Sequence, residues 1–386
     1  MSTGIKERRR AMRIELQNAG GLAPGPVWIE GDAIALGGSR QAENRIDLSG
    51  LALLPGIIDA HGDGFERHLA PRRGAVSDLG AGLRASEVEL ASNGITTAFL
   101  AQFWSWEGGM RGPDFARDLA AALANYDSAL DLRLQLRVEL CLHREFDAIA
   151  DQVTTHAIPA VIFNDHLPHK ALAEGRRVPR LEGQALKAGR APQAHQALLE
   201  ELYRDLPQAR AALPAFAARL AAAGVILGSH DDPDAEARDR AREIGLGLAE
   251  FPLTLETARA ACAAGDPVVL GAPNVLRGSS HKRGGMAARE AVEAGLVRAL
   301  ASDYHYPAPR LAAAKLVREG WSLRRAWALV SAGPAEVFGL SDRGQIAEGG
   351  RADLVVTSAD LTQVHGTFAG GRLVYADAIL SARMLA

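Results

Sequence analysis

Two polar side chains that could hold a metal ion come directly after an apolar segment near the start of the chain. The stretch IIDAHGD ends in His61 and Asp63. Residues separated by one position on a β-strand point to the same side, so these two side chains can share one ion. Imidazole and carboxylate ligands together suit borderline divalent ions such as zinc, manganese or iron. The pattern therefore predicts a divalent-metal site at this point of the chain.

Other apolar segments also end in imidazole or carboxylate side chains. These residues are Glu139 in RVEL, Asp165 and His166 in IFNDH, His230, Asp231 and Asp232 in LGSHDD, and Asp303 in LASDYH. A lone histidine near a strand end is usually structural or lies on the surface. Several such residues at several strand ends are hard to explain as independent accidents, and this coincidence points to one shared site.

Six ligands could hold two ions, with one carboxylate bridging them. The metal ligands that we predict are His61, Asp63, Glu139, His166, His230 and Asp303. A metal pair lowers the pKa of bound water and produces hydroxide near pH 7. We expect two divalent ions, zinc before manganese or iron, and we assign to Asp303 the catalytic role of accepting the proton from the water.

The elements that would bring these residues together alternate regularly between about residues 53 and 340. The expected strands are LPGIID, GITTAFLAQ, LQLRVEL, PAVIFND, GVILGSHDD, LGLAEFPLT, PVVLGAPN and LVRALASD, and the expected helices include residues 84–93, 114–126, 209–223, 234–243, 286–294 and 308–318. Eight such alternations predict the α/β class and a (β/α)₈ TIM-type barrel, whose strand ends converge on one face. A doubly wound sheet is the alternative, but no G-x-G-x-x-G follows the first strand.

Both ends of the chain have the alternating, glycine-broken pattern of short strands. We therefore predict a small β-sandwich domain from residues 1–54 and 341–386, and a barrel from residues 55–340. A long insertion at about residues 167–195 is rich in Arg, Gly and Pro, and it predicts a loop or lid.

The near-neutral charge of the chain does not exclude a local basic pocket for an anionic ligand, and several cationic residues lie near the expected strand ends. Our candidate substrate-binding residues are His68, Arg72, Asn274, Arg277, His281, Lys282 and Arg283. The last five lie in the glycine-rich stretch NVLRGSSHKRGG, where backbone N–H groups can approach an anion. A solvated turn explains this stretch equally well from the residues alone. The insertion adds arginines and lysine, but arginine-rich loops are commonly just solvated.

Composition sets limits on the class of protein. The chain has 386 residues, a formal net charge of -3 and two cysteines, which excludes a disulfide framework and a four-cysteine zinc site and fits a reducing compartment. No apolar run approaches the roughly 20 residues of a membrane span. The near-neutral balance argues against bulk nucleic-acid binding. We expect a cytoplasmic protein without nucleic-acid or membrane partners, and a homodimer is compatible with these features.

Several motifs resemble a known family. LLPGIIDAHGD and GQIAEGGRADLVV are similar to the amidohydrolase superfamily, whose members pair a metal-dependent barrel with a small β domain built from both termini. More narrowly, HGDGFERHLAPR, NDHLPH, GSHDD, GAPNVLRGSSHKRGGMAA and LASDYHYPA resemble the alpha-D-ribose 1-methylphosphonate 5-triphosphate diphosphatases of the carbon–phosphorus lyase pathway. The resemblance covers nearly all of residues 25–375.

The resemblance implies a hydrolase of phosphonate metabolism that cleaves a small ribosyl triphosphate to the 5-phosphate and pyrophosphate. It also implies metal ligands at His61, Asp63, His166, His230 and Asp303. The bridging ligand in the superfamily is often a carboxylated lysine or a glutamate. No lysine lies between residues 6 and 170, so Glu139 is our candidate for the bridge.

Three residues depart from the family pattern. Gly62 and Gly64 flank Asp63 where the family has larger side chains, and His305 is additional. These departures leave the exact substrate open. Two other classes also stay open: another amidohydrolase reaction, such as that of a deaminase or cyclic amidase, and a non-enzymatic scaffold with a barrel shape.

Overall fold

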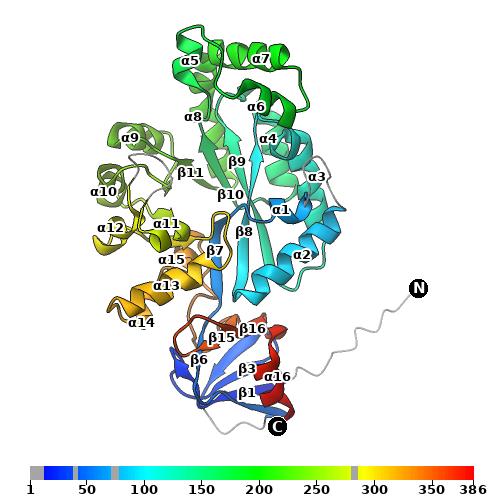
Figure 1. Cartoon of the computed structure of the whole chain (residues 1–386), viewed down its shortest axis with the longest axis vertical. Coiled ribbons are helices and arrows are strands. Elements are labelled where there is room, and N and C mark those ends of the chain that lie inside the picture. The colour runs from blue at the N-terminus through cyan, green and yellow to red at the C-terminus, as the bar shows by residue number, and fades with distance from the viewer. Residues whose placement is uncertain (1–12, 38–41, 71–77, 280–285) are drawn as a thin grey trace, which may run out of the picture.

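The computed structural model describes residues 13–37, 42–70, 78–279 and 286–386 (Figure 1). Within them, eight parallel strands follow one another in the order β14-β13-β12-β11-β10-β9-β8-β7. They are β7 Ile57–Gly62, β8 Ile95–Trp104, β9 Asp131–Glu139, β10 Ala160–Asn164, β11 Ile226–His230, β12 Leu248–Glu250, β13 Val268–Gly271 and β14 Ala299–Ala301. Every strand matches one that the sequence pattern predicted.

A single bridge between β7 and β14 closes this sheet into a barrel. Gly62 pairs in parallel with Asp303. The backbone N–H of Asp303 donates to the carbonyl of His61 at 2.9 Å, and that of Asp63 donates to the carbonyl of Asp303 at 2.9 Å. The predicted (β/α)₈ barrel is thus confirmed, and the residues that close it are predicted site residues.

Helices cover the outside of the barrel because its strands are apolar on both faces. All ten residues of β8, for example, are buried, as expected for a parallel strand with helices outside it. The covering helices are α1 Glu66–Leu69, α2 Leu79–Ser92, α3 Pro113–Ala124, α4 Phe146–Thr155, α8 Leu206–Ala222, α9 Ala235–Glu243, α10 Leu255–Ala263, α11 Ala272–Arg277, α12 Ala288–Glu293, α13 Ala308–Arg318, α14 Leu323–Ala328 and α15 Ala332–Val337. No helix within the described ranges is both long enough and apolar enough to cross a membrane.

The insertion at 167–195 is largely helical, so the expectation of a loop was wrong for most of its length. It contains α5 His169–Ala173 and α6 Leu181–Lys187 and runs into α7 Pro192–Arg204. Its helices form because Leu172, Leu181 and Ala185 are buried, while most of its charged residues stay exposed. These helices lie at the end of the molecule opposite to the small β domain that contains β1, β3 and α16 (Figure 1).

The two ends of the chain form the small β-sandwich that the sequence predicted. One sheet has the order β4-β3-β1-β5 and the other β17-β16-β15-β6-β2. The strands are β1 Arg13–Gln17, β2 Gly20–Gly21, β3 Val27–Glu30, β4 Ala33–Leu36, β5 Asn44–Asp47, β6 Leu51–Pro55, β15 Leu354–Ser358, β16 Val364–Ala369 and β17 Arg372–Ala376, followed by α16 Ala378–Leu385. Ile14, Val27, Leu53, Val356 and Phe368 share one buried cluster. The boundaries at residues 54 and 341 stay a prediction.

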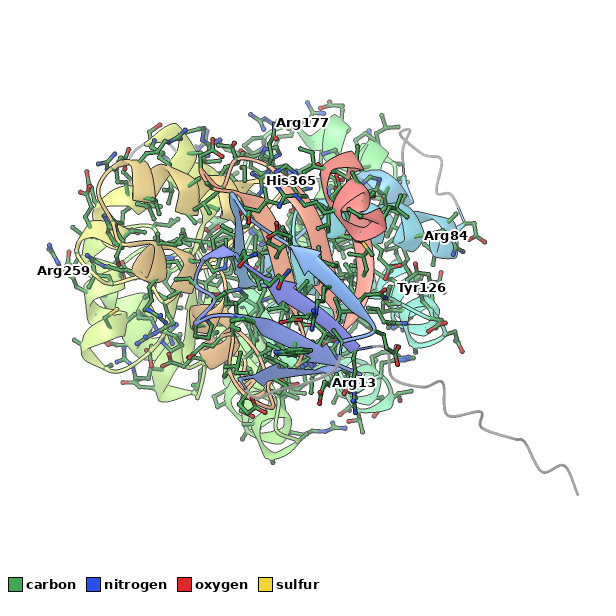
Figure 2. All side chains as sticks on the ribbon, turned by 90° about the horizontal axis from the view of Figure 1, so that it is seen from below. Arg13, Arg84, Tyr126, Arg177, Arg259 and His365 are labelled. Atoms are coloured by element: carbon green, nitrogen blue, oxygen red, sulfur yellow. The ribbon has the colours of Figure 1, made fainter. Side chains whose placement is uncertain are left out.

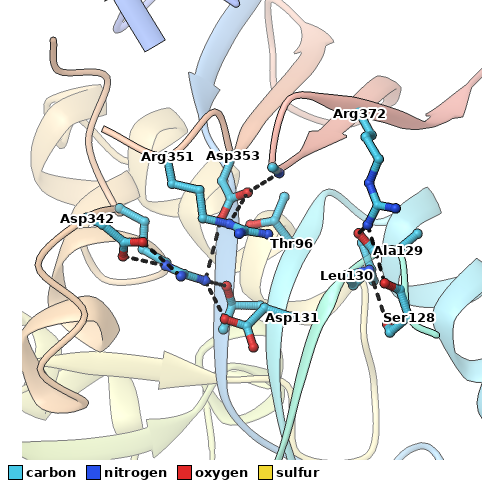
Figure 3. A network of polar contacts seen from close by, with 12 residues as sticks. Thr96, Ser128, Ala129, Leu130, Asp131, Asp342, Arg351, Asp353 and Arg372 are labelled. Atoms are coloured by element: carbon cyan, nitrogen blue, oxygen red, sulfur yellow. Dashed lines mark hydrogen bonds and ion pairs between the residues drawn. The ribbon is translucent and has the colours of Figure 1, made fainter. Parts of the chain in front are cut away.

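Seen from below, the sandwich lies in front of the barrel, with Arg13 and His365 on its strands (Figure 2). An ion-pair network joins it to the amino ends of β8 and β9 (Figure 3). Arg343 donates to Thr97 Oγ1 at 2.9 Å, to Asp131 Oδ2 at 2.6 Å and to Asp342 Oδ1 at 2.8 Å. Arg351 pairs with Asp353 at 3.0 Å. We call these residues, Thr97, Asp131, Asp342, Arg343, Arg351 and Asp353, the base network.

Candidate active site

Six of the predicted site residues line a cavity of about 400 Å³ at the carboxyl ends of the barrel strands, namely His61, His166, His230, Asn274, Arg277 and Asp303. Its lining includes His61, His166, His230, Asp231 and Asp303. Barrel enzymes carry their active sites at this end because loops after every strand can contribute side chains there. The convergence expected from the sequence is therefore present.

A buried carboxylate that the sequence analysis missed lies between two of the histidines. Glu250, the last residue of β12, has one oxygen 2.9 Å from His61 Nδ1 and the other 2.7 Å from His230 Nδ1. The two imidazole rings lie 5.7 Å apart, centroid to centroid. Because an ionised carboxylate only accepts hydrogen bonds, it holds the proton on Nδ1 of both rings. This leaves each Nε2 as the nitrogen available to a ligand.

A second glutamate holds the third histidine in the same way. Glu139 Oε1 lies 2.5 Å from His166 Nδ1, and Oε2 accepts the backbone N–H of His166 at 3.0 Å. Both carboxylate oxygens of Glu139 are therefore engaged with His166. The carboxylate between two histidines is Glu250, and the assignment of Glu139 as a bridging metal ligand stays a prediction.

Strand β9 supplies three inward side chains, each of which contacts a different part of the site. Gln135 donates to Glu250 Oε1 at 2.9 Å, Arg137 donates to His230 Nε2 at 2.8 Å, and Glu139 holds His166. They alternate along the strand, so they point to one side. The same period of two in QLRVE was the signal that could have identified Gln135 and Arg137 from the sequence.

Burial and these partners shift the protonation of the cluster. Burial lowers the pKa of His61, but the attraction of the Glu250 carboxylate outweighs it and the net shift is upward. Burial and then the charge of Arg137 lower the pKa of His230 to about 4. Burial raises the pKa of Glu250, but the two histidines bring it below its usual range. His230 is therefore neutral at pH 7, the form that binds metals.

The residues present fit a divalent metal. His61, His230 and Glu250 offer ligand atoms within 4.8 Å of one another, and so do His166, His230 and Asp231. Among the described residues, Nε2 of the buried His61 has no hydrogen-bond partner, whereas its Nδ1 lies 2.9 Å from Glu250 Oε1. Unsatisfied buried nitrogens are costly unless something binds them. Mixed nitrogen and oxygen donors suit zinc, manganese or iron.

The two predicted aspartate ligands lie beside this cluster. Asp303 lines the cavity, directly after β14, with a backbone φ of +55°. The side chain of Asp63 is not among the described lining residues, although its backbone is bonded to that of Asp303. Neither aspartate falls within the two groups of close ligand atoms in the described part of the chain. Their roles as ligands, and the catalytic role of Asp303, stay predictions.

Arginines from three segments line the same cavity. They are Arg111 and Arg137, which the sequence analysis missed, and Arg277, which it predicted. Arg111 and Arg137 both stack on the Phe103 ring, at 4.3 and 4.0 Å from its centroid. Arg277 donates to the hydroxyl of Tyr304 at 3.0 Å. The cavity therefore combines a histidine and carboxylate cluster with a cationic wall.

The other predicted substrate residues have different positions. Asn274 lines the cavity, but its side-chain amide is bonded to the backbone of Met286 at 3.1 Å and Ala288 at 3.0 Å. His68 contacts Glu89 at 2.6 Å and is not among the described lining residues. Arg72, His281, Lys282 and Arg283 lie outside the described residues. From the insertion, Gln184 lines the cavity, whereas Arg177 pairs with Glu182.

Comparison with known sequences identifies the family. The sequence pattern of the amidohydrolase family matches residues 75–375. The chain belongs to the amidohydrolase family. It is 32% identical over 342 residues to the alpha-D-ribose 1-methylphosphonate 5-triphosphate diphosphatase of Escherichia coli (strain K12). The aligned region covers 86% of this chain and 90% of that relative. The predicted resemblance is thus confirmed.

Solved amidohydrolase-type structures share the fold. A Xaa-Pro dipeptidase with bound methionine has a TM-score of 0.63 at 16% identity and covers 95% of this chain and 100% of its own. A beta-aspartyl dipeptidase from Fervidobacterium islandicum AW-1 in complex with beta-Asp-Leu dipeptide has a TM-score of 0.59 at 17% identity, covering 95% and 98%. At this identity, the likeness concerns the fold alone.

In this amidohydrolase, neighbouring side chains occupy the space beside the two unusual glycines. A Cβ atom at Gly62 would lie 2.5 Å from Asp59 Oδ2 and 2.9 Å from Ser302 Oγ. Asp59 accepts hydrogen bonds from the backbone and the hydroxyl of Ser302 at 2.8 and 2.5 Å. At Gly64, a Cβ would lie 2.9 Å from the Arg67 guanidinium. Gly62 therefore lets β7 and β14 pack closely at the barrel closure.

Proposed function

We propose that this amidohydrolase is a metal-dependent diphosphatase of phosphonate catabolism. Its substrate would be alpha-D-ribose 1-methylphosphonate 5-triphosphate or a close analogue, and its products the 5-phosphate and pyrophosphate. The observation that carries the proposal is the union of a histidine and carboxylate cluster with three arginines in one cavity. A triphosphate needs several cationic donors, and guanidinium groups match its oxygens. The 32% identity to the diphosphatase of Escherichia coli supports the same substrate class.

His61, His166 and His230 would hold the metal, with Asp63, Asp303 and Glu139 as the predicted further ligands; two ions, most simply zinc, remain part of the proposal. When bound, divalent ions lower the pKa of water and neutralise charge on phosphoryl oxygens. Glu250 and Glu139 keep the imidazoles in one tautomer and orientation, which raises their affinity for a cation. The protein would thus supply a preorganised set of ligands rather than assemble one around the ion.

The remaining steps belong to side chains of the cavity. Asp303 accepts the proton of the attacking water. Cationic side chains of the cavity wall hold phosphoryl oxygens and stabilise the charge that develops on them. Phe103, Trp106 and Phe251 line the cavity and exclude bulk water, which strengthens these electrostatic interactions. The enzyme would act in the cytoplasm on a small phosphorylated substrate, without nucleic-acid or membrane partners.

Pyrophosphate release from a ribosyl triphosphate tests the proposal. The purified enzyme should release pyrophosphate from that substrate faster than from nucleoside triphosphates, and removal of metal by a chelator should abolish the reaction until metal is restored. A panel of cyclic amides and amino-substituted rings tests the alternative, a deaminase or cyclic amidase. Turnover of that panel with no release of pyrophosphate would refute the diphosphatase assignment.

A further inference from the structure

Arg137 is a buried arginine that, among the described residues, makes no direct hydrogen bond or ion pair with a carboxylate. Its side chain is 5% exposed, and its guanidinium contacts Asn164 Oδ1 at 3.2 Å and His230 Nε2 at 2.8 Å. Neither partner is a carboxylate. Its Nε is buried and, within the described residues, has no hydrogen-bond partner. Taking a charge out of water without a counter-charge is costly.

Another buried arginine shows the usual solution. Arg238 is fully buried, and carboxylate oxygens of Asp232 and Asp266 lie at 3.2 and 3.3 Å from its guanidinium. Arg137 differs because the space in front of it is the cavity rather than another carboxylate. An anion that enters this cavity would therefore give Arg137 a direct ion-pair partner, in addition to the longer-range attraction of Glu250, Asp63 and Asp231.

A second guanidinium enlarges this cationic wall. Arg111 stacks on the same Phe103 ring as Arg137 and also lines the cavity. It lies 3.2 Å from Glu107 and 3.7 Å from Glu66, so its own charge is compensated. The stacking fixes the planes of both guanidinium groups, and a fixed fork of N–H donors suits tetrahedral oxyanions.

The metal and Arg137 share one partner atom. His230 Nε2 is the nitrogen that Glu250 leaves available to a ligand, and it is also the acceptor for Arg137. Ligation of that nitrogen would remove the acceptor, and the N–H of Arg137 Nη2 that now points to it could then be donated to an anion. The cation site and the anion site are therefore contiguous.

We propose that Arg137, assisted by Arg111, binds a phosphoryl group of the substrate directly beside the histidine cluster. This inference rests on the proposed function, because it names the residues that receive the triphosphate at that site. Arg137 is then a specificity-determining residue for phosphorylated substrates over neutral rings.

Binding of inorganic pyrophosphate, the proposed product, tests the inference. Isothermal titration calorimetry on the purified protein, dialysed to remove free metal, should give a Kd that rises at least about tenfold in Arg137→Met. Arg111→Met should weaken binding by a smaller factor. The matched control is Arg117→Met, because Arg117 also stacks on an aromatic side chain of β8, Trp104 at 4.7 Å, but does not line the cavity. Its Kd should stay within about twofold of the wild type.

The outcomes separate this inference from the proposed function. Wild-type affinity for pyrophosphate in a folded Arg137→Met protein would overturn the inference, even where the enzyme cleaves ribosyl triphosphates. A second outcome is that Arg137→Met loses pyrophosphate binding while the wild-type enzyme turns over amides and not ribosyl triphosphates. That result would support the oxyanion site and refute only the diphosphatase assignment. If Arg137→Met does not fold, Arg137→Lys keeps the charge without the planar fork, and its unchanged Kd would likewise count against the inference.

Discussion

The two ends of the barrel each hold a buried arginine, and the two arginines differ in their partners. At the base, all three guanidinium nitrogens of Arg343 have hydrogen-bond acceptors, including the carboxylates of Asp131 and Asp342. At the opposite end, which we call the mouth, the carboxyl ends of the strands surround the cavity. There Arg137 contacts the amide of Asn164 and the imidazole of His230, and its Nε has no hydrogen-bond partner in the described structure. A paired buried charge stabilises contacts between elements, whereas an unpaired one is suited to a ligand that brings the opposite charge. The difference predicts that substitutions at the mouth change activity and that substitutions at the base change stability.

The largest effect should come from Asp303→Asn at the mouth. Removing a general base typically lowers turnover by about 10²- to 10⁴-fold, and asparagine tolerates the positive φ of this position. We expect kcat for pyrophosphate release to fall by about a thousandfold while metal content and the midpoint of thermal unfolding stay close to wild type. Undiminished turnover in this variant would remove Asp303 from the mechanism.

The next effect should come from Arg343→Met at the base. The variant removes one of the two arginines that face each of Asp131 and Asp353, so the free energy of unfolding should fall by about 2 kcal/mol. Urea unfolding measures this change. The control is Arg324→Met, because Arg324 is exposed and its loss should leave the free energy of unfolding close to that of the wild type. Turnover per folded molecule should stay unchanged; a large loss of turnover without loss of stability would contradict the contrast between the two ends.

A smaller effect should follow Glu250→Gln. The amide keeps the size of the side chain but no longer holds the Nδ1 protons of His61 and His230 as a charged acceptor. Loss of such a supporting carboxylate typically lowers metal affinity by about 10- to 100-fold. Competition with a chromogenic chelator measures the affinity. Asp131→Asn, which removes a carboxylate at the base instead, should leave the metal affinity unchanged.

The smallest effect concerns acid sensitivity at the base. Burial alone would raise the pKa of Asp131, but hydrogen bonds and charges from Arg133 and Arg343 bring it below its ordinary 3.8. A carboxyl whose pKa is lowered by folding stabilises the native state above its unfolded pKa, and this contribution is lost as the pH falls through the lowered value. Urea unfolding should therefore show a difference of about 1 kcal/mol between wild type and Asp131→Asn at pH 6 that shrinks below about pH 4. If the difference in unfolding free energy between the two proteins instead grew as the pH fell, the predicted direction of the pH dependence would be wrong.

The fold was predictable from the sequence because a parallel barrel repeats one simple pattern. Each buried strand is an apolar run, as in Ile95–Trp104, and each is followed by a helix or a loop. The helices of the insertion were missed because the short apolar stretches around Leu172 and Leu181 are interrupted by Gly, Pro and Arg. Their burial depends on tertiary contacts, such as the bond from Arg190 to the carbonyl of Trp106 at 2.6 Å, that no local pattern reveals.

The candidate site was predictable only in part. His61, His166, His230 and Asp303 stand at strand ends, and the structure brings them to one cavity. Glu250 also ends a strand, but a single glutamate in LAEF is indistinguishable from a surface residue until two histidines are seen on either side of it. Arg137 was missed because a charged residue inside a strand usually faces solvent, and only the barrel closure shows that this side of β9 faces inward. The aspartates and Glu139 were predicted partly from family resemblance, and their roles await the experiments above.

The single bridge between Gly62 and Asp303 ties activity to complete assembly. The first and last strands of the ring meet through the very residue proposed to take up the proton. A chain in which the strands have formed but Gly62 and Asp303 have not yet paired would already contain the three histidines. It would not yet hold Asp303, the proposed proton acceptor, in position beside them. If Asp303 accepts the proton as proposed, molecules without this junction would lack activity until the barrel closes.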